Sequence, residues 1–306
     1  MAQSTLRLGT RGSTLARVQA AMVAALLAAR GIACEIVEVK TSGDRIQDKT
    51  LADAGGKGLF TKELEEVLLS GAIDFAVHSM KDVPAALPRG LAIAAVLKRE
   101  DPADAFLSNA YPSLAALPRG ARVGTSSVRR TALVRRARPD IETVLLRGNV
   151  DTRLSKLDAG QYHAILLALA GLKRLGLAAR ATQILSCDSW LPALAQGAIG
   201  IEMRTDDAAT RAALSPLNDA NTEIALACER AFQAALDGSC RTSMGGLAAV
   251  ADGVLSFRGE VLAPDGSGFE EIDFKVPLGN DAAAEAACAG REAGLALKPR
   301  VSHWLA

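Results

Sequence analysis

The sequence has few aromatic residues and no long hydrophobic run. Phe, Tyr and Trp together contribute eleven of its 306 residues, which leaves little side-chain surface for stacking against bases. The apolar stretch Val18–Ala29 is interrupted by Gln19 and is too short to span a bilayer. The N-terminal residues MAQSTLRLGTRGS lack the apolar segment of a signal peptide. The sequence therefore predicts neither a nucleic-acid binder nor a membrane protein.

Residues that commonly bind metals are scarce and scattered. The five cysteines form no CxxC pair, and the three histidines are far apart in the sequence. We therefore expect no zinc or other metal site. An odd number of cysteines without short spacings favours reduced thiols, which is typical of a cytoplasmic protein.

A strong overall charge is also missing. The formal net charge is +1, so no long-range field would recruit nucleic acid or an anionic membrane. Basic residues are nevertheless concentrated locally, because residues 119–180 hold eleven Arg and two Lys against four acids, a balance of +9. Arg binds carboxylate or phosphate with two parallel hydrogen bonds. Composition alone leaves open whether this segment is a solvated helix face or an anion site.

Hydrophobic periodicity predicts alternating strands and helices in two units. We expect strands at 6–10, 36–39, 73–78 and 91–97, and then at 122–125, 141–146 and 164–169. Helices are expected after Ser13, at 61–69, and from near Ser127, Asp151 and Gly171. This alternation favours mostly parallel sheets. The segment 41–58 has no periodicity, and its length is typical of a lid.

Two segments indicate crossings between the units. Residues 98–104 break the pattern with charge and proline, and residues 196–202 predict a strand that returns to the first unit. From residue 221 onwards a helix, three strands with hairpin turns and a last helix follow. We therefore predict an α/β fold of two lobes with mixed, mostly parallel sheets, plus a small C-terminal α+β domain. The predicted ranges are 1–97 with 198–217, 103–192, and 220–306.

Cationic and hydroxyl side chains follow the predicted strands where each strand ends. Ligands of open α/β sheets bind at this edge, and helix N-termini there favour anions. Arg129 and Arg130 oppose the dipole of the helix they begin, so we expect an anion between them and the helix start. The predicted anion site comprises Arg11, Ser13, Ser79, Lys81, Thr125, Ser126, Ser127, Arg129, Arg130, Arg147, Arg153 and Arg174.

Two further residues have chemical potential. Asp82 is a single carboxylate among these cations, so it could stabilise a cationic intermediate or move a proton, or it could simply pair with Lys81 or an Arg. Cys240 lies on a predicted loop before Arg241, an environment that favours a reactive thiolate. No His is paired with it, which argues against a cysteine-protease arrangement.

Short motifs run in order along the first two units. They are TRGS (10–13), GGKGLF (55–60), HSMKDVP (78–84), REDP (99–102), GTSSVRR (124–130), LRGNV (146–150), TRLSKL (152–157), AGLKR (170–174) and QGAIGIE (196–202). Together they resemble the hydroxymethylbilane synthases, also called porphobilinogen deaminases. The C-terminal part resembles this family mainly in its length, its hairpins and its cysteine loop.

The resemblance implies a transferase with two lobes like those of periplasmic binding proteins. Such enzymes join four porphobilinogen molecules head to tail, release ammonia at each step, and free hydroxymethylbilane by hydrolysis. The resemblance also implies a dipyrromethane cofactor on a thioether to Cys240, and no metal. Asp82 would be catalytic, the cationic residues would bind carboxylates of cofactor and substrate, and Lys57 and Phe60 would belong to the lid. A monomer without nucleic-acid or membrane partners is implied as well.

Two other functions remain as alternatives. A two-lobed binding protein for a dicarboxylate or a phosphate ester would share the fold and the anion site, but it would need neither Cys240 nor Asp82. A nucleic-acid binder could use residues 119–180, but the arginines there follow strand ends inside a predicted cleft, and few aromatic residues accompany them.

Overall fold

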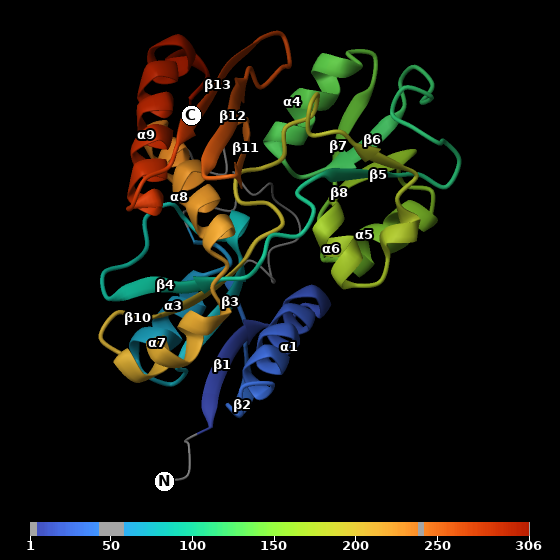
Figure 1. Ribbon diagram of the computed structural model, residues 1–306. Helices are drawn as coiled ribbons and strands as arrows, with labels where there is room; N and C mark the ends of the chain where they lie inside the picture. The colour runs from blue at the N-terminus through green and yellow to red at the C-terminus, as the bar shows by residue number, and fades with distance from the viewer. Residues whose placement is uncertain (1–4, 43–57, 238–241, 306) are drawn as a thin grey trace.

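Three sheets organise the chain into two lobes and a C-terminal domain (Figure 1). The computed structural model describes residues 5–42, 58–237 and 242–305. The strand orders are β2-β1-β3-β10-β4 in the first lobe, β7-β6-β8-β5-β9 in the second, and β11-β12-β13 in the C-terminal domain. The first-lobe strands are β1 (Leu6–Arg11), β2 (Cys34–Val39), β3 (Phe75–Ser79), β4 (Leu91–Val96) and β10 (Ile199–Arg204). The second-lobe strands are β5 (Asp104–Leu107), β6 (Arg122–Thr125), β7 (Glu142–Leu145), β8 (Ala164–Ala168) and β9 (Gln183–Leu185). The last three strands are β11 (Met244–Ala251), β12 (Val254–Leu262) and β13 (Phe269–Pro277).

Helices cover these sheets and pack on their apolar faces. In the first lobe they are α1 (Thr14–Ala28), α3 (Lys62–Leu69) and α7 (Ala208–Leu214). In the second lobe they are α4 (Val128–Ala137), α5 (Val150–Asp158) and α6 (Leu169–Arg174). The C-terminal domain has α8 (Ala220–Ala235) and α9 (Ala282–Val301), whose apolar residues form one core with β11 and β12. No helix within the described ranges is long and apolar enough to cross a membrane.

The predicted fold class is confirmed, and the antiparallel members of the two large sheets are the crossing strands. β1, β2 and β3 are parallel, whereas β10 runs antiparallel to β3 and β4. In the second lobe, β6, β7 and β8 are parallel, whereas β5 runs antiparallel to β8 and β9. Each antiparallel strand thus begins at the edge where the parallel strands end. The sequence prediction missed β5, β9 and α7.

The two linkers between the lobes meet at Glu229 of α8. This carboxylate is fully buried and accepts hydrogen bonds from the Arg99 guanidinium at 2.5 and 3.2 Å. It also accepts from the backbone N–H groups of Ala195, at 2.5 Å, and Ala248, at 2.8 Å. Arg99 belongs to the first linker, Ala195 to the second and Ala248 to β11. One side chain of the C-terminal domain therefore ties both linkers to that domain.

The hairpin between β12 and β13 docks against the second lobe. Leu262 belongs to the apolar core under α4, and Arg135 donates a hydrogen bond to the Pro264 carbonyl at 3.1 Å. Gly266 has a φ of +78°, and a Cβ atom there would lie 2.7 Å from the backbone nitrogen of Arg136. Only a glycine fits this turn without strain, because both the left-handed backbone and the close approach to α4 exclude a side chain.

Candidate active site

A cavity of about 680 Å³ lies between the lobes, at the edge where the parallel strands end. Residues of both lobes line it, and Thr242 and Met244 of the C-terminal domain contribute to its wall. The volume is typical of a site for a small organic ligand. The predicted site residues that line the cavity are Arg11, Ser13, Phe60, Ser79, Lys81, Asp82, Ser126, Ser127, Arg129, Arg130, Arg147, Arg153 and Arg174.

One described residue of the predicted set, Thr125, is not part of this wall, and two others lie outside the described residues. Thr125 is buried and does not line the cavity, and its hydroxyl accepts a hydrogen bond from the backbone N–H of Ser127 at 3.2 Å. Thr125 therefore shapes the turn before α4. Lys57 and Cys240 lie outside the described residues. Thr242, two residues after that cysteine in the sequence, does line the cavity.

The hydroxyl groups of the site also organise the backbone around it. Ser13 and Ser127 are the N-caps of α1 and α4, and their side chains accept from the N–H groups of Ala16 and Arg130. A capping hydroxyl keeps its own proton, so it can still donate to a bound anion. Ser79 exchanges hydrogen bonds with the amide of Gln19, at 2.9 and 3.2 Å. Sequence reasoning did not single out Gln19, although it lies on the inner face of α1.

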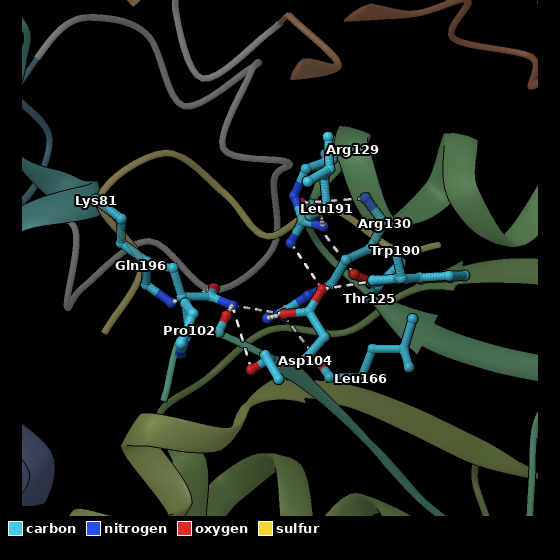
Figure 2. Close-up of polar contacts among 12 residues, drawn as sticks. Lys81, Pro102, Asp104, Thr125, Arg129, Arg130, Leu166, Trp190, Leu191 and Gln196 are labelled. Atoms are coloured by element: carbon cyan, nitrogen blue, oxygen red, sulfur yellow. Dashed lines mark hydrogen bonds and ion pairs between the residues drawn. The ribbon is translucent and has the colours of Figure 1, made fainter. Parts of the chain in front are cut away.

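Arg129 and Arg130 line the cavity as predicted, but an internal carboxylate that the prediction did not include pairs with both of them. Both guanidiniums donate to the carboxylate of Asp104, Arg129 at 2.8 Å and Arg130 at 2.6 Å (Figure 2). They also donate to the carbonyls of Leu191, at 2.7 Å, and Leu166, at 3.0 Å. Asp104 is fully buried. Burial alone would raise the pKa of Asp104, but the two guanidiniums outweigh it and hold the pKa well below its usual range.

Asp104 reaches this position because β5 is antiparallel. It is the first residue of β5 and pairs with Ala168, the last residue of β8, so it lies at the edge where α4 and the cavity begin. The sequence analysis took residues 98–104 as a charged crossing and missed this carboxylate. An acid directly before the apolar run Ala105–Leu107 was the available signal.

Gln196 connects this cluster to the other lobe. Its amide nitrogen donates to Asp104 at 2.8 Å and to the carbonyl of Pro102 at 2.7 Å. Its amide oxygen accepts from Lys81, which follows β3 of the first lobe, at 3.5 Å (Figure 2). The chain from Lys81 through Gln196 to Asp104 thus spans the gap between the lobes.

Lys81 and Asp82 face the cavity from the short helix Met80–Asp82. The Lys81 side chain is exposed to the cavity space, but protein from both lobes surrounds it. This enclosure lowers the pKa of Lys81 to about 8, and nearby Arg130 and Arg153 act in the same direction. Enclosure likewise lowers the pKa of Arg153 to about 10, assisted by Arg130 and Arg147. The cavity therefore holds crowded positive charge that an anionic ligand would relieve.

Several arginines of the wall have donor groups that no described residue satisfies. The Nε atoms of Arg129, Arg130 and Arg174 are buried, and none has a hydrogen-bond partner among the described residues. Arg174 also donates to the carbonyl of Gly197 in the second linker at 2.6 Å. Arg11 stacks over the ring of Phe60, with 4.2 Å between the guanidinium carbon and the ring centroid. Among the described residues, the wall thus combines fixed cations, hydroxyls and one carboxylate, Asp82.

Comparisons with known proteins match nearly the whole chain. Residues 6–212 match the family model "Porphobilinogen deaminase, dipyromethane cofactor binding domain", and residues 224–298 match "Porphobilinogen deaminase, C-terminal domain". The porphobilinogen deaminases of Nitrobacter hamburgensis and Nitrobacter winogradskyi are 52% and 51% identical over 97% of this chain and 93% of theirs. Among solved structures, the methionine-binding protein MetQ matches 70% of this chain and 89% of its own, with 13% identity and a TM-score of 0.46. The chain therefore belongs to the porphobilinogen deaminase family.

Proposed function

We propose that the cavity between the lobes is where this transferase condenses porphobilinogen to hydroxymethylbilane, in tetrapyrrole biosynthesis. The observation that carries this proposal is the convergence of cations from both lobes on one cavity, beside Asp82, the one carboxylate among the described lining residues. Each porphobilinogen brings an acetate and a propionate, so a lengthening chain accumulates negative charge. Guanidinium groups bind carboxylates in two-point geometry, which orients a ligand as well as neutralising it.

We infer that Asp82 stabilises the cationic intermediate of the reaction. Loss of ammonia leaves a cationic methylene-pyrrolenine, which a carboxylate stabilises electrostatically and through the pyrrole N–H. Asp82 lies in the cavity wall and immediately follows Lys81, the amine with the lowered pKa. It can therefore accept and return a proton where positive charge develops.

The described residues fit a dipyrromethane group. Its acidic substituents match the buried, partnerless Nε atoms of Arg129, Arg130 and Arg174. The hydroxyl of Thr242, in the wall two residues after Cys240, is also buried without a partner among the described residues. We infer that Cys240 anchors the group through a thioether. When bound, the group supplies the pyrrole carbon to which the first substrate molecule is joined, so Cys240 anchors and does not turn over.

Intact-mass measurement of the purified protein tests this proposal. The mass should exceed that of the sequence by two linked pyrrole units, and Cys240→Ser should lose the increment. Cys288→Ser is the matched control, because Cys288 is an exposed thiol outside the cavity wall, and it should retain the increment. A two-lobed anion-binding protein would have the bare mass in all three proteins, and that outcome would refute the proposal.

We also propose that the enzyme acts as a monomer in the cytoplasm, without a nucleic-acid or membrane partner. A monomer is what the family resemblance implies, and the net charge of +1 offers no general attraction for polyanions. Light scattering during turnover measures the mass of the active species. A dimer at enzyme concentrations that support full activity would contradict this proposal.

A further inference from the structure

We propose that Asp104 is a positioning residue of the reaction: it fixes the cationic wall of the second lobe and, through Gln196, connects that wall to Lys81 of the first lobe. The inference rests on the proposed function and extends it to a residue that does not line the cavity. Asp104 acts only through the side chains that it holds.

Each oxygen of the Asp104 carboxylate has two partners. Oδ2 accepts from Arg129 at 2.8 Å and from the indole of Trp190 at 3.0 Å. Oδ1 accepts from Arg130 at 2.6 Å and from Gln196 at 2.8 Å. Four donors, two from α4 and two from the segment between β9 and β10, therefore converge on one group, and their directions are set together (Figure 2).

This carboxylate also makes the pairing of two buried cations possible. Arg129 and Arg130 are 3% and 6% exposed and adjacent in sequence, so their charges repel in a medium of low dielectric constant. One carboxylate between them leaves a net charge of +1. Their Nε atoms are buried and have no hydrogen-bond partner within the described chain. Without the carboxylate, the guanidiniums would reorient, and carboxylate binding would lose its preset geometry.

The contact with Gln196 links Asp104 to Lys81 in the other lobe. Because the amide nitrogen is held by Asp104 and by Pro102, the amide oxygen must face Lys81. The charge of Asp104 also favours the protonated amine of Lys81, together with Asp82 and against Arg130 and Arg153. Removing that charge should therefore lower the pKa of Lys81. Coulomb's law across one intervening amide, at effective dielectric constants between about 20 and 80, gives a decrease of roughly half a unit to one and a half units.

The test compares Asp104→Asn with a matched variant, Asp140→Asn. Asp140 is a partly buried carboxylate of the same lobe that binds Arg138 at 2.8 Å and does not line the cavity. Both variants are assayed for kcat and KM with porphobilinogen between pH 6.5 and 9.5. The pKa of Lys81 is measured separately by NMR of the side-chain amine, with Lys81→Met assigning the signal. Asp104→Asn should lower kcat/KM on the order of 10–100-fold and shift both the alkaline limb and the NMR pKa downwards. Asp140→Asn should change neither.

Two outcomes decide the proposal. A folded Asp104→Asn with unchanged Lys81 pKa and kcat/KM within twofold of the parent would overturn it. If Asp104→Asn does not fold, the double variant Asp104→Asn/Arg129→Met keeps the cluster at a net charge of +1. Because Asp104 acts on Lys81 more strongly than Arg129 does, the Lys81 pKa should still fall, and an unchanged pKa would overturn the proposal. A parent protein that does not consume porphobilinogen would instead refute the proposed function, and the NMR titration would still test the link from Asp104 to Lys81.

Discussion

Raising the pH from 7 to 9 should weaken substrate binding without unfolding the protein. Lys81 has a pKa of about 8, because it is enclosed by protein and because Arg130 and Arg153 repel added charge. The amine is therefore mostly charged at pH 7 and mostly neutral at pH 9. If the neutral amine does not bind substrate carboxylates, kcat/KM should fall roughly tenfold between these two pH values.

The stability contribution of the same group has the opposite sign. The folded-state pKa of Lys81 lies below the unfolded value of 10.5, so the unfolded chain binds more protons between pH 8 and pH 10.5. Stability contributed by this group therefore rises with pH across that window, while activity falls. A loss of activity above pH 8 is thus expected without a loss of structure through Lys81.

The assay measures kcat/KM and the melting temperature in parallel from pH 6.5 to 9.5. Lys81→Met should have low activity, and its pH profile should lack the fall of kcat/KM at high pH, the alkaline limb. Its melting temperature should also lack the pH dependence that Lys81 contributes in the parent. Lys62→Met is the control, because the Lys62 side chain is 70% exposed on α3 and does not line the cavity, and it should keep the limb. Persistence of the limb in Lys81→Met would refute the assignment.

Three further predictions concern other parts of the molecule. Asp82→Asn should lower kcat on the order of 10²–10⁴-fold with a small change in KM, measured in steady-state turnover, since the amide keeps the shape but cannot take up the proton; an unchanged kcat would exclude the role. Gly266→Ala should destabilise the protein by about 2–5 kcal/mol in denaturant unfolding, because it adds a clash with α4 to the left-handed backbone. Gly253→Ala, at φ +72° with open space around it, should cost only about 1–2 kcal/mol, and equal losses would contradict the docking of the hairpin on α4. Cys228 is fully buried, and burial raises the pKa of its thiol, so thiol reagents should label it only on unfolding; rapid labelling of the native protein would contradict this.

The α/β arrangement was predictable because its signals are local. The apolar spacing after Ser13 predicts α1, and the structure has that serine as the N-cap. The turn residues 264–267 predict the hairpin between β12 and β13, which is present. β5 was missed because it is only four residues long and begins with a charged residue after a charged linker, so no alternation is visible.

The residues that line the site were predictable, but the ion pairs between them were not. The rule that ligands bind where parallel strands end brings Arg11, Lys81 and Arg153 to one cavity, and they do line it. The same rule cannot predict that Asp104 lies among them, because its position depends on β5 running antiparallel. Whether an arginine meets a ligand or an internal acid is a question of tertiary contacts, which local spacing does not encode.

The buried Glu229 joins both linkers between the lobes to the C-terminal domain. A pair of lobes connected by two free linkers can rotate as an independent clamp. Here the linker residues Arg99 and Ala195 are held by one carboxylate on α8, which also binds the backbone of β11. Since Thr242 in the cavity wall lies just ahead of β11, we expect any opening of the lobes to displace that wall as well. Movement of the wall together with the linkers would then make room for a longer product.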